Sequence, residues 1–368
     1  MKKKSFIAGF ILILVVLATS GCFDFLKNEK TVTTYTPSPV EIHYSISYGY
    51  RVTCRGTGEF DIEYDCDLPE ILVGEVTSIR YLNNDCEEKN LVNNSMVSWN
   101  LTGKGNKNYN LGITADIVAR GYVVSDLDGK GALTVQEISE QHHNILEQYG
   151  HAQANETTVF IDPNDPSIKI TAQGVLYDTA SSNSFIIAKN LFIWLKDNTY
   201  YKPHSSEDEN IQTASVTKRL RYGDCDDLSF LYISLCRSVG IPARFIRGFT
   251  VRENENGYVE AVPHAWVEVF VGGDIGNDGW IPVECACNSS DMQIQVHQNF
   301  AIETADHLRL FIDQGSNESF IVSISGIKAK YEKNKMVVEI ESIDDINSYD
   351  PVEKKELRID ENNQRYYI

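Results

Sequence analysis

The feature that most constrains the fold of this chain is a cysteine placed at the start of a predicted helix. Cys225 follows a turn at Tyr222 and Gly223 and opens a run with apolar residues at helical spacing. The run ends at Gly240 and Pro242, which are typical helix stop signals. Unpaired amides and the positive dipole end at a helix N-terminus favour a thiolate, an effect that Asp226 and its neighbour partly oppose.

Two strand candidates follow this helix, and each carries a side chain that can move a proton. Segment 264–270 begins with His264 and is apolar on both faces, and segment 280–284 ends with Glu284 after a glycine-rich turn. As adjacent antiparallel strands, the two segments would bring His264 and Glu284 together. A thiol nucleophile needs a base and a group that orients that base. The predicted triad is therefore Cys225, His264 and Glu284.

These segments resemble the transglutaminase-like family of papain-type thiol enzymes. The resemblance covers about residues 157–310 and extends to segment 235–244, which is similar to the family's helix end and first strand, and to helical segments after Asp162 and at 188–201. It implies an α+β fold with helices packed on an antiparallel sheet, and acyl transfer on an amide without a metal. One position departs from the family, because Glu284 stands where Asp is usual, which we expect to weaken or reposition the triad.

Supporting residues are predicted around the triad. Trp266 and Tyr222 are candidates for an oxyanion donor or for support, although Trp266 and Trp280 also fit a core. Cys236, eleven residues into the helix, is expected to be a core residue.

The first 22 residues predict export. Lys2 to Lys4 precede an apolar run, and small residues precede Cys22, so residues 1–21 form a signal peptide with a lipobox and Cys22 is the predicted lipidation site. An uncleaved anchor or an ordinary secretory signal are the alternatives. All three place the body outside the cytoplasm, and the lipobox places it on the outer face of the cytoplasmic membrane.

The formal net charge of −19 argues against nucleic acid as a partner. We expect protein or peptide substrates or a cell-envelope polymer, and the membrane as an anchor. The predicted organisation is a signal peptide (1–21), a tether (22–40), an N-terminal β domain (41–125), the transglutaminase-like catalytic domain (126–310) and a short C-terminal β appendage (311–368).

The β domain is predicted from alternation of apolar residues. Residues 42–52 and 60–64 alternate around a glycine-containing turn at 55–58, which predicts a hairpin. That turn would hold Cys54 and Cys66 too far apart for a disulfide, and a bridge of Cys66 with Cys86 is the alternative. Strand-like runs at 320–324 and 336–343 define the C-terminal appendage and could complete the N-terminal sheet.

One segment has two interpretations. Residues 126–137 fit a calcium-binding loop at several positions, with Asp126, Asp128 and Glu137 as candidate ligands, but Lys130 cannot ligate calcium. The favoured interpretation is a glycine-rich turn before a helix capped by Thr134 and Glu137. No other cofactor is expected.

The function predicted from the sequence is a surface-tethered thiol enzyme that acts on peptide, isopeptide or glutaminyl amides, with hydrolysis favoured over cross-linking. The alternatives are a catalytically inactive domain used as an extracellular binding module, and a calcium-dependent adhesion protein built on residues 126–137.

Overall fold

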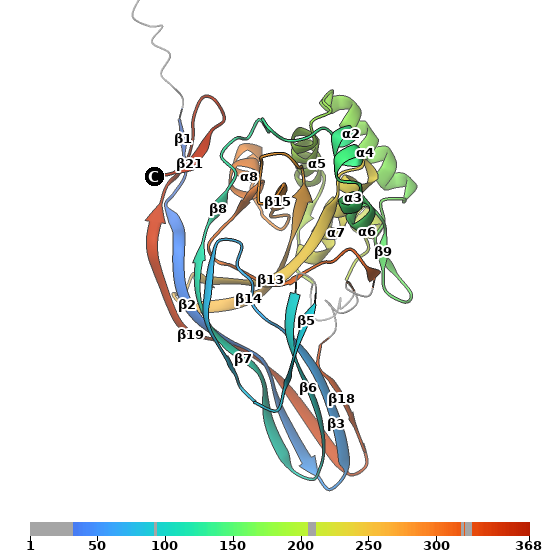
Figure 1. The fold of residues 1–368 in the computed structure, drawn as a ribbon, viewed down its shortest axis with the longest axis vertical. Coiled ribbons are helices and arrows are strands. Elements are labelled where there is room, and N and C mark those ends of the chain that lie inside the picture. Colours follow the sequence, from blue (N-terminus) through green and yellow to red (C-terminus); the bar gives the residue numbers. More distant parts are fainter. Residues whose placement is uncertain (1–31, 92–93, 205–210, 318–319, 321–325) are drawn as a thin grey trace, which may run out of the picture.

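The protein has an α+β fold in which a long β-sandwich lies beside a compact helical part (Figure 1). The computed structural model describes residues 32–91, 94–204, 211–317, 320 and 326–368. The predicted signal peptide and Cys22 therefore lie outside the described residues. Among the residues that are described, no helix is both long enough and apolar enough to cross a membrane.

The sandwich consists of two four-stranded antiparallel sheets. One sheet has the order β19-β2-β7-β4 and the other has the order β18-β3-β6-β5. Their bounds are β2 (Ser38–Gly56), β3 (Glu59–Asp67), β4 (Gly74–Tyr81), β5 (Glu87–Leu91), β6 (Asn94–Lys104), β7 (Lys107–Arg120), β18 (Lys328–Tyr331) and β19 (Met336–Lys355). Alternate side chains of each strand point into the space between the sheets, which accounts for the period-two pattern of the sequence.

The predicted hairpin at residues 55–58 is wrong. β2 and β3 are consecutive but belong to different sheets, because both edges of β2 are already paired, one with β19 and the other with β7. Gly56 makes this possible: it has φ +138°, and a Cβ there would lie 2.1 Å from the carbonyl oxygen of Lys335. The turn thus carries the chain from one layer of the sandwich to the other. The pattern predicted the apolar faces correctly, but not the strand that pairs with each edge.

The C-terminal strands complete both sheets of the sandwich, which agrees with the expectation that they could complete the N-terminal sheet. β19 pairs with β2 from Met336 opposite Gly56 to Lys355 opposite Ser38, and β18 pairs with β3. The strand predicted at 320–324 is not described beyond Phe320, which is buried in the helical core. The N-terminal and C-terminal segments therefore fold as one unit around the same core.

The helical part, called the catalytic part after the prediction from the sequence, contains a four-stranded antiparallel sheet of order β15-β14-β13-β17. Its strands are β13 (Ala243–Glu253), β14 (Val259–Phe270), β15 (Trp280–Val283) and β17 (His307–Ile312). The helices beside it are α2 (Val135–Gln141), α3 (His143–Tyr149), α4 (Pro166–Thr179), α5 (Ser184–Asn198), α6 (Ala214–Leu220), α7 (Cys225–Ser238) and α8 (Met292–Asn299). The strands and helices predicted for this region are present, which agrees with the papain-like arrangement expected from the sequence.

The remaining strands of the described residues are short. They are β1 (Thr33–Thr34), β8 (Tyr122–Val123), β9 (Gln153–Ala154), β10 (Val159–Ile161), β11 (Tyr200–Tyr201), β12 (Tyr222–Gly223), β16 (Ile302–Glu303), β20 (Leu357–Ile359) and β21 (Arg365–Tyr367). The sandwich core also includes Val251, Ala261 and Leu308 from the far end of the catalytic sheet, so the two parts share apolar packing. The described cysteines are all free, which removes the alternative bridge between Cys66 and Cys86.

Candidate active site

Cys225 is the first residue of α7, as the sequence predicts. Asp224 caps this helix: its side chain accepts the amide of Asp227, and the Asp227 side chain accepts the amide of Asp224. This capping box fixes where the helix begins. The rest of α7 is buried, so the sulfur is held at the end of a rigid element, partly exposed at the rim of the core.

The environment of Cys225 raises the pKa of its thiol. Burial is the largest cause, followed by the negative charges of Asp226 and Asp224, while a hydrogen bond from the backbone of Ala265 acts in the opposite direction. Burial of the thiol and the charges of Asp226 and Asp224 thus oppose the stabilisation of a thiolate that the sequence predicts for the helix N-terminus. The proton stays on sulfur until a base removes it.

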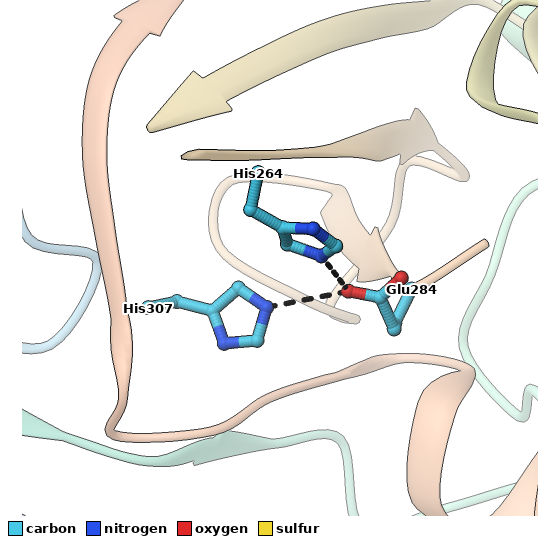
Figure 2. Close-up of side chains that lie close together, drawn as sticks. All are labelled: His264, Glu284 and His307. Carbon is cyan, nitrogen blue, oxygen red and sulfur yellow. Dashed lines mark hydrogen bonds and ion pairs between the residues drawn. The ribbon is translucent and has the colours of Figure 1, made fainter. Parts of the chain in front are cut away.

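The candidate base is the residue before Ala265, whose backbone hydrogen-bonds to Cys225. His264 lies on β14 immediately before Ala265, and its Nε2 is 2.6 Å from Oε2 of Glu284, which follows β15 (Figure 2). The prediction that two antiparallel strands bring these residues together is confirmed. Since Nε2 donates to the carboxylate, Nδ1 is the nitrogen left to accept the thiol proton.

Glu284 is anchored at both oxygens. Oε1 accepts the backbone N–H of Ala286 at 2.6 Å, and Oε2 accepts from His264 and, at 3.4 Å, from His307. Burial raises the pKa of Glu284, but the charges and hydrogen bonds of His264 and His307 outweigh burial and hold that pKa well below its usual range. A glutamate has one more rotatable bond than the aspartate usual at this position, and these contacts remove that freedom.

His307 is a site residue that the sequence analysis missed. It opens β17, and its Nδ1 lies 3.0 Å from Oδ1 of Asp306 and 3.0 Å from Oγ1 of Thr304. Burial lowers the pKa of His307, but the hydrogen bonds to Asp306 and Glu284 and the nearby negative charges raise it to about 10. These contacts favour the cationic form of His307, which shares Oε2 of Glu284 with His264 (Figure 2). The only sequence signal was an Asp-His pair before an apolar strand.

The Trp266 ring packs against both histidines of the site. Its ring lies 5.9 Å from that of His264 at 21°, and its edge contact with His307 has a centroid distance of 4.8 Å. The indole N–H donates to Glu303 at 2.9 Å in a buried position. It is therefore unavailable to an oxyanion, so the oxyanion role suggested for Trp266 is wrong, whereas a supporting role matches its contacts.

The tyrosine near the thiol is Tyr201 and not the predicted Tyr222. Tyr222 packs on Tyr200 and lies under the Nζ of Lys202, 4.5 Å from the ring centroid. Tyr201, which pairs with Gly223, is the one beside the thiol: burial, then Cys225, Asp224 and Glu284 raise the pKa of its hydroxyl. Tyr200 and Tyr201 are adjacent on a strand and point in opposite directions, so the sequence alone does not show which one faces the thiol.

The calcium interpretation is wrong for Glu137. Its carboxylate accepts the backbone N–H of Thr134 at 2.8 Å in the capping box at the start of α2, which is the favoured sequence interpretation. Asp126 accepts the amides of Asp128 and Lys130. In the part of the chain that the structure describes, the clusters with ligand atoms close enough for a metal are elsewhere. They are His264, Glu284 and His307, and His204, Asp224 and Asp227.

Comparison with known proteins agrees with this geometry. A family model described as "Transglutaminase-like superfamily" matches residues 175–285. The chain is 31% identical over 118 residues to the uncharacterised protein YebA of Bacillus subtilis, an alignment that spans 30% of this chain and 15% of that protein.

A solved structure has a similar fold over most of the chain. It is a Cytophaga hutchinsonii protein provisionally described as a cysteine protease, with a TM-score of 0.51 and 14% identity, and the match covers 92% of this chain and 100% of the other. The likeness therefore extends beyond the catalytic part to the sandwich.

Proposed function

Because the chain contains a transglutaminase-like superfamily domain, we propose that it is a thiol enzyme that cleaves or transfers the acyl group of an amide. Cys225 is the nucleophile, His264 is the base and Glu284 orients His264. The observation that carries the proposal is the bond between His264 Nε2 and Glu284 Oε2. It leaves Nδ1 for a thiol whose helix begins beside the next residue, Ala265.

Because the pKa of the thiol is raised, proton transfer to His264 accompanies the attack of sulfur and does not precede it. His264 Nδ1 takes the proton of Cys225 as sulfur attacks the amide carbon, so that a C–S bond forms while the S–H bond breaks. The negative charge on the carbonyl oxygen is stabilised at the N-terminus of α7, whose first N–H groups have no partner within the helix. Glu284, held at both oxygens, stabilises the imidazolium that forms.

Collapse of this intermediate transfers the proton from His264 to the leaving nitrogen, breaks the C–N bond and leaves a thioester on Cys225. Water, deprotonated by His264, then attacks the thioester carbon and the thiol regains its proton. An amine can replace water in this step. Peptide, isopeptide and glutaminyl amides are all compatible substrates, and we favour hydrolysis.

The alternative is an inactive domain that serves as an extracellular binding module. The observation that favours it is the raised pKa of the Cys225 thiol. Mass spectrometry of the intact protein after mixing with p-nitrophenyl acetate separates the two functions. The enzyme forms an acetyl adduct on Cys225 that decays with time, and His264→Ala forms it much more slowly. Absence of a transient adduct on Cys225 in the wild type would favour the binding module.

The proposal includes attachment to the outer face of the cytoplasmic membrane through a lipid on Cys22. Its support is the sequence of residues 1–22, with lysines, an apolar run and small residues before the cysteine. Metabolic labelling with a radioactive fatty acid tests it. Label should enter the wild type and be absent from Cys22→Ser, and equal labelling of the two proteins would contradict it.

A further inference from the structure

A cavity of about 290 Å³ lies where the sandwich meets the catalytic sheet. Tyr48 and Tyr64 come from the sandwich strands β2 and β3, and Phe249 and Pro263 come from β13 and β14. The cavity is therefore built by both parts of the molecule. Its size is near the lower end of the range for small-molecule pockets, which suits one side chain or a short aliphatic amine.

The cavity borders the candidate active site. Pro263 immediately precedes His264, and Arg247, another wall residue, is the strand partner of Ala265. Arg247 also acts electrostatically on Asp226, the residue after Cys225. A ligand bound here would thus lie beside the strand segment and the helix end that hold the reacting groups.

The cavity wall carries a net negative charge. Arg247 Nη2 is 2.6 Å from Asp67 Oδ2, so these two charges compensate each other. Asp65 and Asp344 also belong to the wall. Lys89 lies 3.4 Å from Asp65, but both side chains are about half exposed, and such pairs contribute little. The remaining field at the mouth therefore favours a cation.

The aromatic lining suits the same ligand. Tyr50 and Tyr64 meet edge to face with centroids 5.0 Å apart, and Tyr48 and Phe249 are tilted at 5.8 Å. Tyrosine and phenylalanine faces attract ammonium groups, and they also pack against the methylene stem of an alkylamine. An aromatic wall with carboxylates at its rim thus matches a lysine-like group better than a neutral or acidic one.

We propose that this cavity is a binding site for the alkylammonium group of a lysine-like side chain of the acyl donor. The inference rests on the proposed function, because it assigns the cavity to that reaction.

The test compares two esters on the full-length protein in detergent: the p-nitrophenyl esters of Nα-acetyl-lysine and Nα-acetyl-norleucine, which differ in the ammonium group. We expect kcat/KM to favour the lysine ester by about tenfold. In the double variant Asp65→Asn/Asp344→Asn this ratio falls toward one. Asp345→Asn is the matched control, since Asp345 is an exposed neighbour on β19 outside the cavity wall, and it should keep the wild-type ratio. A wild-type ratio near one, or a ratio that the double variant retains, overturns the inference.

Added n-butylamine tests the site by competition. Saturable inhibition of lysine-ester hydrolysis, with the norleucine ester unaffected, supports the inference, and equal inhibition of both esters contradicts it.

A binding measurement separates this inference from the proposed function. Saturation-transfer NMR on Cys225→Ala should detect Nα-acetyl-lysine amide but not Nα-acetyl-norleucine amide, and the double charge variant should lose the lysine signal. If no ester is turned over but this selectivity is present, the proposed function fails and the binding site stands. If esters are turned over without selectivity in either experiment, the binding site fails alone.

Discussion

The interiors of the sandwich and of the catalytic part differ in what they bury. The sandwich core is apolar and aromatic, with residues such as Ile46, Val52 and Trp99 fully inside. The catalytic sheet instead carries Glu268 and Arg309 in positions that are 1% and 3% exposed. Burying charges is costly unless they are paired. The sandwich interior is thus mainly apolar, whereas the sheet beside the candidate active site also buries a charge network.

That network connects to the proposed base. Arg309 lies 2.8 Å from Glu268 and 2.6 Å from Glu303, and Glu303 accepts the indole N–H of Trp266. Burial raises the pKa of Glu268, but its arginine neighbours outweigh this and hold it at about 2. The charges thereby fix the ring that stacks under His264. The contrast between the two interiors predicts different outcomes for substitutions in each.

The largest effect is expected for Arg309→Leu. Buried Glu303 loses its arginine partner and Glu268 keeps only Arg244, so the free energy of unfolding should fall by about 3–5 kcal/mol, measured by urea denaturation. Arg51→Leu is the control, because Arg51 pairs with Glu341 on the exposed surface, and it should change stability by less than about 1 kcal/mol. Equal losses of unfolding free energy in the two variants would contradict the claim that the buried charge network contributes to stability.

A cavity in the sandwich should affect stability alone. Ile46→Ala deletes a fully buried side chain and should cost about 3 kcal/mol. At a temperature where the variant is folded, the rate of iodoacetamide labelling at Cys225 should match that of the wild type. A labelling rate that falls several-fold in the folded variant would show that the sandwich core controls the site.

His307→Gln should reduce kcat/KM for ester hydrolysis by about tenfold, because Glu284 loses a charged anchor. Its effect on stability depends on pH. The pKa of His307 is raised in the folded protein to about 10, so its stabilising contribution is complete below an unfolded-state pKa of about 6.5 and is lost as pH rises through about 10. The stability difference from the wild type should shrink across that window, and a difference independent of pH would contradict a cationic His307.

The smallest effect is expected for Asp226→Asn. Burial, then Asp224 and Asp227, raise the pKa of Asp226 to about 7, and its charge raises the pKa of the Cys225 thiol. Removing the charge should speed labelling of Cys225 a few-fold above pH 7 and leave it unchanged below about pH 6. Because ionisation of a buried carboxyl costs stability as pH rises from about 4 to 7, the variant should also be more stable than the wild type at pH 8. Equal labelling at pH 8.5 would contradict this role.

The sequence predicted the parts of the site that depend on local signals. Cys225 was found because a glycine-containing turn and an apolar period indicate a helix start, and His264 and Glu284 because a turn-rich connection makes their strands neighbours. His307 and Tyr201 were missed, since no spacing rule links a distant strand or an alternating tyrosine pair to the cleft. The pairing of β2 with β3 was predicted incorrectly, because apolar alternation indicates the buried face of a strand but not its partners, which are β7 and β19.

The central claim is that His264 activates Cys225, and the pH dependence of iodoacetamide labelling at Cys225 tests it most directly. Rates at each cysteine can be followed by mass spectrometry in the wild type and in His264→Ala. The account predicts that labelling of Cys225 near pH 8 is at least about tenfold slower in the variant, while Cys86 and the other thiols are unaffected. The same rate and pH profile at Cys225 in both proteins would contradict it.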